Sequence, residues 1–330
     1  MNQFLRHLSP TQQVGLLFVV VFGILLFASI SVFALSLREH PDADVAAKRR
    51  AELKRLGALI KTSWLISGVF WFGWASGPNF ATVLFAVISF FALREFVTLS
   101  PTRRGDHRSL VLAFFVVLPI QYWLTATEHF DLFTVFIPVY VFLAIPVVSA
   151  LADDPHRFLE RNAKLQWGIM VCVYGMSHVP ALLLLDFPNW PEAKNAFLVF
   201  FLAIVVQTCM VVQHVASRKF PRAPRAPHIS QSFNWLSWAI GVGTGGFLGG
   251  LLAGLTPFGP AQGLAMGFIA CVAGSLGHLV MKALKRDRGV PLWTEYGTSV
   301  TGATGLLARV DALCFAAPVF FHSVRWYFDL

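Results

Sequence analysis

The sequence predicts an all-α, polytopic membrane protein with about ten transmembrane helices. Of its 330 residues, 56% are hydrophobic and only 13% are charged, and the mean hydropathy is +0.64. A soluble domain carries about 25% charged residues, so this chain has too little polar surface to remain in water. A third observation is that its basic residues gather in every second connection between apolar stretches.

Apolar stretches that could cross a bilayer core of about 30 Å as helices recur along the whole chain. The expected spans cover about residues 14–35, 64–75, 81–96, 110–124, 132–151, 167–185, 196–216, 235–255, 263–284 and 306–328. The first stretch exceeds the apolar core of about 7–15 residues in a signal peptide, and no small-residue cleavage site follows it. We expect two parts: residues 1–62, with this helix and a basic segment, and a membrane domain over residues 63–330.

The distribution of lysine and arginine predicts the orientation of the helices. Alternate connections hold 23 of the 26 basic residues, and the other side of the membrane holds only Arg6, Lys194 and Arg325. Cytoplasmic loops carry such an excess of positive charge. We therefore expect both termini to face away from the cytoplasm and the connection before the last helix to face the cytoplasm.

The segment of residues 42–61 allows two interpretations. Its basic and apolar residues are arranged as in an amphipathic helix that lies on an anionic lipid surface. The same residues also suit an ordinary, positively charged cytoplasmic connection.

Few polar residues inside the spans are candidates for chemistry. His178, His214 and His278 match no metal-binding spacing, and we expect each to be a hydrogen-bonded packing residue. The four cysteines show no pairing or zinc spacing, so we expect small, buried apolar side chains. The glycines of residues 241–254 form small-xxx-small pairs, which predict close helix packing.

The last sixty residues contain the densest group of charges. Basic residues flank a glycine-containing loop at the start of the last helix: Lys285, Arg286, Arg288 and Arg309. Backbone N–H groups and basic side chains in this arrangement can bind a phosphate or another anion. The alternative is that these side chains only anchor the helices at the membrane surface.

This region resembles the phosphatidate cytidylyltransferase (CDP-diacylglycerol synthase) family. The residues that carry the resemblance are Lys285-Arg286-Asp287-Arg288-Gly289 and the stretch from Gly302 through Arg309 and Asp311 to His322, with Ala92–Phe96, Pro101–Arg104, Arg157–Arg161 and Gln166–Gly168 upstream. It extends over most of the chain from about residue 60, and it is closest to a bacterial subgroup with an extra N-terminal helix. The resemblance implies a multi-pass protein of the bacterial inner (cytoplasmic) membrane with its site on the cytoplasmic side.

The resemblance also implies a reaction, in which CTP and phosphatidate give CDP-diacylglycerol and pyrophosphate in phospholipid biosynthesis. Such chemistry uses Mg²⁺ held by carboxylates, and those are largely missing here. Ala308 replaces the first aspartate of the family's closing motif, and only Asp311 remains of that pair. From Ala196 onward the chain holds four acidic residues: Asp287, Glu295, Asp311 and Asp329.

We therefore expect a catalytically degenerate family member whose Lys285, Arg286, Arg288 and Arg309 bind a phosphate or the head group of a phosphatidate-like phospholipid. One alternative is an active nucleotidyltransferase that binds CTP and Mg²⁺, with a rearranged site that uses Asp311, Glu295 and His278. Another is a non-catalytic partner subunit of an active lipid-synthesis enzyme. The expected assemblies are a homodimer or a heteromer with an active paralogue. A transporter is disfavoured because the chain shows no internal repeat, and no nucleic-acid partner is expected.

Overall fold

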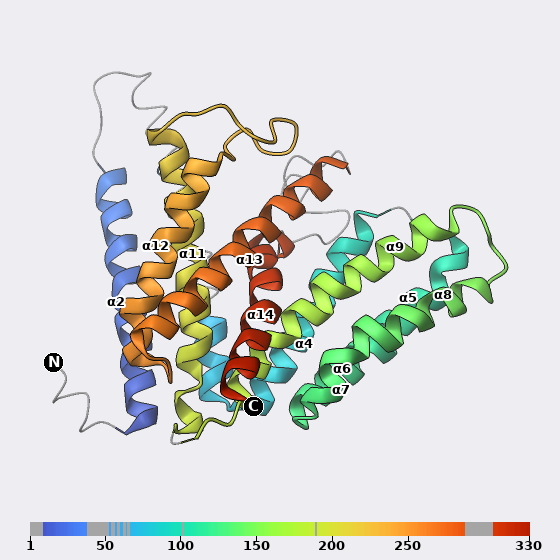
Figure 1. The fold of residues 1–330 in the computed structure, drawn as a ribbon, viewed down its shortest axis with the longest axis horizontal. Helices are drawn as coiled ribbons and strands as arrows, with labels where there is room; N and C mark the ends of the chain where they lie inside the picture. Colours follow the sequence, from blue (N-terminus) through green and yellow to red (C-terminus); the bar gives the residue numbers. More distant parts are fainter. Residues whose placement is uncertain are drawn as a thin grey trace. The chain divides into compact units, whose positions relative to one another are not determined.

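A computed structural model describes residues 9–37, 67–100, 102–188, 190–287 and 306–330, together with residues 53, 57, 60, 61 and 64. Among these residues every regular element is a helix, apart from one isolated bridge between Ala226 and Ser230. This confirms the predicted all-α membrane class (Figure 1).

The helices follow one another in the order α2 (Pro10–Ser36), α4 (Pro78–Thr98), η1 (Arg104–Asp106), α5 (His107–Leu112), η2 (Ala113–Val117), α6 (Leu118–Ala126), α7 (Phe130–Val135), η3 (Phe136–Val141), α8 (Phe142–Ala150), α9 (Phe158–Ile169), η4 (Met170–Gly175), α10 (Met176–Ala181), η5 (Leu182–Leu184), η6 (Glu192–Lys194), α11 (Ala196–Lys219), α12 (Trp235–Leu252), η7 (Ala253–Leu255), α13 (Pro260–Asp287) and α14 (Leu307–Phe328). Residues 67–75 are also helical.

Eight continuous helical stretches are long and apolar enough to cross a membrane. Each coincides with one of the spans expected from the sequence. α14 has 22 residues but is less apolar, because Arg309, Asp311 and Arg325 interrupt it. The expected span at residues 64–75 is only partly described, so the total of about ten stays a prediction.

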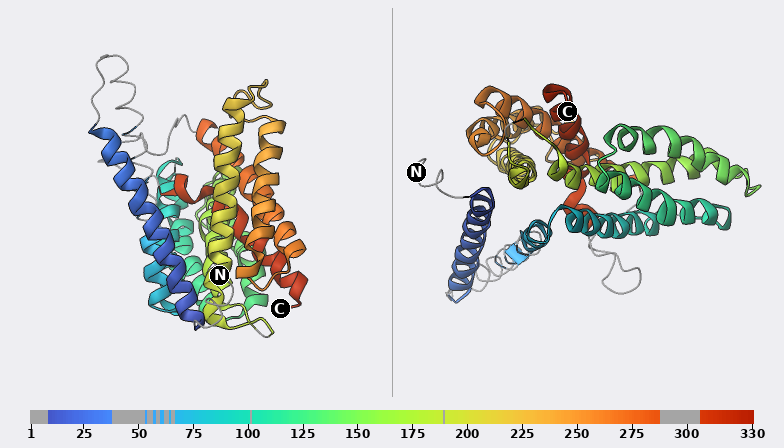
Figure 2. Two further views of the ribbon diagram at one scale, coloured as in Figure 1. Left: turned by 90° about the vertical axis from the view of Figure 1, so that its left-hand side faces the viewer. Right: turned by 90° about the horizontal axis from the view of Figure 1, so that it is seen from below.

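The chain divides into two compact units, Met1–Ala81 and Thr82–Leu330. The boundary expected at residues 62–63 lies outside the described residues. Within the second unit, α12 packs against α11 and α13, and α14 packs against α13 and η4. Seen from below, α14 lies between α11–α13 on one side and the green helices α5–α9 on the other (Figure 2, right).

Three of the membrane-crossing stretches contain a turn of π-helix, at η2, η3 and η4. A π turn inserts an extra residue and redirects the side chains that follow it. At the end of η4, a Cβ atom on Gly175 would lie 2.2 Å from the carbonyl oxygen of Cys314. Only glycine therefore allows this turn to pack directly on the backbone of α14.

The predicted packing roles are confirmed for the cysteines and for most glycines of residues 241–254; the exceptions are Gly243 and Gly254, where an added Cβ would meet no atom within 4 Å. A Cβ atom on Gly249 of α12 would lie 2.5 Å from the carbonyl oxygen of Gly263 in α13, so these helices meet through their backbones. All four cysteines are buried and free of disulfides. Fully buried aromatic rings fill much of the remaining core, and Phe201 of α11 lies 5.7 Å from Phe320 of α14 between ring centroids.

Candidate functional site

The candidate site lies where α13 ends and α14 begins. His278, Lys282 and Lys285 are spaced four and three residues apart, so they share one face of α13. This face meets Asp311, which lies in the second turn of α14. We call these four residues the α13–α14 site.

Asp311 is held by two side chains of α13. One carboxylate oxygen, Oδ2, lies 2.9 Å from Nδ1 of His278 and 3.9 Å from Nζ of Lys285. The other, Oδ1, accepts a hydrogen bond of 2.7 Å from the backbone N–H of Ala312. Asp311 is only 3% exposed, so its negative charge is compensated inside the protein rather than offered to solvent.

The close approach of α13 and α14 at this point depends on Gly277. A Cβ atom there would lie 2.2 Å from Cγ of Phe315, at the fixed base of the ring. His278 follows Gly277 directly, so the same contact sets how near the imidazole comes to Asp311.

Glu95 of α4 is a further acidic residue at this place. It is 3% exposed, and its Oε2 accepts a 3.0 Å hydrogen bond from the backbone N–H of Leu306, immediately before α14. Its charge also acts on Lys285. The acidic residues predicted for the site all lie after Ala196, so Glu95 is not among them. Its signal in the sequence is that it is the one acidic residue in the apolar helix Pro78–Thr98.

The expected basic residues are only partly described. Lys285 is largely buried, with its side chain 12% exposed, whereas Arg286 and Arg309 are exposed near the helix ends. Arg288 and Glu295 lie outside the described residues, so their proposed roles in binding or catalysis stay predictions.

The described residues do not fit the Mg²⁺ ion that the resemblance implies. Mg²⁺ takes carboxylate and phosphate oxygens in octahedral geometry. Oδ2 of Asp311 contacts the His278 imidazole and is ion-paired with Lys285, and Oε2 of Glu95 accepts a backbone N–H. In the part of the chain that the structure describes, no group of three histidine, cysteine or acidic residues could hold a metal ion.

The two other candidate histidines lie elsewhere. His178 is fully buried in α10, with its Nδ1 2.7 Å from the carbonyl oxygen of Tyr174 and its ring 4.6 Å from that of Phe133. His214 is exposed toward the end of α11. Neither belongs to the α13–α14 site.

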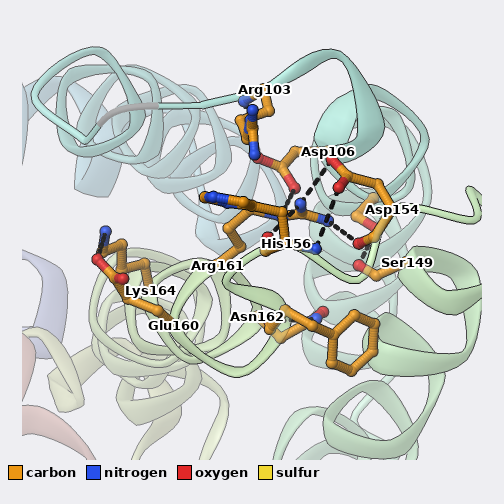
Figure 3. Close-up of polar contacts among 11 residues, drawn as sticks. Arg103, Asp106, Ser149, Asp154, His156, Glu160, Arg161, Asn162 and Lys164 are labelled. Carbon is orange, nitrogen blue, oxygen red and sulfur yellow. Dashed lines mark hydrogen bonds and ion pairs between the residues drawn. The ribbon is translucent and has the colours of Figure 1, made fainter.

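A second polar cluster surrounds Arg161 of α9 (Figure 3). Its guanidinium lies 2.8 Å from Oδ1 of Asp106 and 2.7 Å from Oδ2 of Asp154, and it donates to the carbonyl oxygens of Asp154 and His156. Asp106 also accepts the N–H of Arg103 at 2.9 Å. We call Arg161, Asp106 and Asp154 the Arg161 cluster. It joins η1, the loop before α9 and α9 itself.

The charge on Asp154 is favoured by this arrangement. Partial desolvation opposes ionisation, but the N–H of His156 donates to its carboxylate and the Arg161 guanidinium lies beside it. Together these contacts lower the pKa of Asp154 below its ordinary value.

Comparison with known proteins identifies a family for this chain. Residues 57–327 match the model of the cytidylyltransferase family. The chain is also similar to a protein described as "Uncharacterized protein YnbB" from Escherichia coli (strain K12), with 34% identity over 254 residues. The match covers 76% of this chain and 81% of that protein.

Proposed function

The chain belongs to the cytidylyltransferase family, and on this premise we propose that it binds the phosphate of an anionic lipid at the α13–α14 site. In this proposal it does not carry out metal-dependent nucleotidyl transfer. It is a multi-pass protein of the bacterial inner membrane that serves phospholipid metabolism, with both termini outside and the site on the cytoplasmic side.

The observation that carries the proposal is the ion pairing of Asp311. By the resemblance this aspartate is what remains of the family's closing pair of acidic residues, and it contacts His278 and is ion-paired with Lys285. A carboxylate that is paired with a lysine and occupied by an imidazole inside the protein offers little negative charge to a magnesium ion. The surrounding charges instead favour an anion.

Basic side chains are in excess at this place. Four basic residues, Lys282, Lys285 and, at the exposed helix ends, Arg286 and Arg309, outnumber the acidic residues Asp311, Glu95 and Asp287. Each basic residue near an anionic membrane surface contributes about 1 kcal/mol of attraction. A lipid phosphate would supply the missing negative charge while its acyl chains stay in the bilayer.

The experiment separates binding from turnover. The purified full chain is assayed with CTP, Mg²⁺ and phosphatidate for release of pyrophosphate, and binding of phosphatidate is measured in nanodiscs against a phosphatidylcholine background. We expect binding that is weakened by Lys285→Ala, and no pyrophosphate. Pyrophosphate release that depends on CTP and is lost in Asp311→Ala would establish the active alternative instead.

The partner-subunit alternative has its own outcome. An active family member that co-purifies with this chain, and whose activity changes when this chain is removed, would support that alternative. A chain that binds phosphatidate as a monomer in mild detergent supports binding without a partner.

A further inference from the structure

The first turn of α14 is tied to α4 across more than two hundred residues of sequence. Oε2 of Glu95 accepts the backbone N–H of Leu306 at 3.0 Å, and Leu306 directly precedes Leu307, the first residue of α14. Glu95 is buried, and it is the one acidic residue of the predominantly apolar α4. A buried carboxylate in such surroundings is costly unless it is hydrogen-bonded or paired.

Two physical effects make this contact a strong one. The N–H groups at the start of a helix have no partner within the helix. The same end carries the positive end of the helix dipole, which favours a negative charge nearby. The carboxylate of Glu95 accepts one of these N–H groups and places a negative charge at this end of the helix. It therefore fixes where α14 begins and how the helix is rotated.

The position of α14 decides the geometry of the α13–α14 site. Asp311 follows Leu306 by five residues, and rotation of this turn would move its carboxylate away from His278 and Lys285. Glu95 also acts on Lys285 through its charge. One residue of α4 is therefore connected to both helices that form the site.

We propose that Glu95 is a positioning residue for the phosphate site, acting through its hydrogen bond to the N–H of Leu306. By holding the start of α14, Glu95 keeps Asp311 against His278 and Lys285, which leaves the lysines arranged for a phosphate. This inference rests on the proposed phosphate binding, and it adds a residue that accepts a backbone N–H rather than touching the ligand.

The test changes each side of the hydrogen bond with a matched control. Glu95→Ala removes the acceptor, whereas Glu95→Gln keeps an oxygen that can accept the same N–H. Leu306→Pro removes the donor at a backbone φ of −62°, which proline adopts readily, whereas Leu306→Ala keeps the donor and shortens the side chain. Binding of phosphatidate in nanodiscs is measured for the full chain, and melting temperatures are recorded alongside.

We expect Glu95→Ala and Leu306→Pro each to weaken binding about tenfold, a change of ~1.4 kcal/mol. Glu95→Gln and Leu306→Ala should stay within about threefold of the unchanged protein. The double variant Glu95→Ala/Leu306→Pro should be no weaker than either single variant, because both remove the same hydrogen bond.

Several results would overturn the inference. Glu95→Ala that binds like the unchanged protein would show that the hydrogen bond does not position the site. Loss of binding in Glu95→Gln, or a gain of about tenfold or more, would show that charge rather than the hydrogen bond is what matters. If Glu95→Ala does not fold, the two Leu306 variants decide the question. If the unchanged protein itself does not bind phosphatidate, the proposed function fails first.

Discussion

The Arg161 cluster and the α13–α14 site are both built from ion pairs on helices of the same unit, but their charges are balanced differently. In the Arg161 cluster, one guanidinium meets two carboxylates and two carbonyl oxygens (Figure 3). In the α13–α14 site, Asp311 is shared by His278 and Lys285, with Lys282 close by. A cluster in which two carboxylates balance one guanidinium stabilises the fold, whereas a surplus of positive charge is suited to an anionic ligand.

The largest effect expected from this comparison is on stability. Arg161→Ala leaves Asp106 without its ion pair in a buried place, and breaking a buried pair costs about 3–5 kcal/mol. Thermal unfolding in detergent should show a large drop in melting temperature. Arg157→Ala is the control, because that side chain is 70% exposed and its ion pair with Glu160 should contribute about 1 kcal/mol or less. Equal losses in both variants would contradict the distinction.

The next effect tests the packing beneath the α13–α14 site. Gly277→Ala places a methyl group on the base of the Phe315 ring, and such overpacking costs about 1–3 kcal/mol. We expect lower stability and weaker phosphatidate binding together, because α13 is pushed away from α14. Gly243→Ala on α12 is the control, since no atom lies within 4 Å of the added Cβ there. Its stability should stay unchanged or rise.

A smaller effect is expected when one positive charge of the α13–α14 site is removed. Lys285→Ala should weaken phosphatidate binding about fivefold, or ~1 kcal/mol. It should lower the melting temperature less than Arg161→Ala does, because His278 still contacts the buried Asp311. Lys219→Ala, at the end of α11, removes a basic residue that lies outside the α13–α14 site and should leave specific binding unchanged. If the two variants weakened binding alike, the attraction would be general to the membrane surface.

The smallest effect concerns acid pH at the Arg161 cluster. Because the folded protein holds the pKa of Asp154 below its ordinary value of 3.8, the unfolded chain binds the proton more readily. The contribution of Asp154 to stability is therefore present above about pH 4 and is lost as the pH falls through the lowered pKa. Melting curves from pH 6 to pH 3 should show a smaller acid-induced loss in Asp154→Asn than in the unchanged protein.

Several features of this protein follow from its sequence alone. Long apolar stretches must bury their backbone polar groups as helices in lipid, so the helical class and the positions of the spans could be read directly. The regular spacing of the glycines in α12 also predicted that this helix packs closely against a neighbour. Local patterns of this kind depend on neighbouring residues, and the sequence contains them in full.

The site itself was decided by the tertiary structure. Asp311 was recognised from its surroundings in the sequence, but its partners His278 and Lys285 lie on another helix. Glu95 comes from a third helix, and its role became visible only when α4 met the start of α14. Which charges neutralise one another depends on distances between helices, and these are set by contacts such as that of Gly277 with Phe315, which no local pattern specifies.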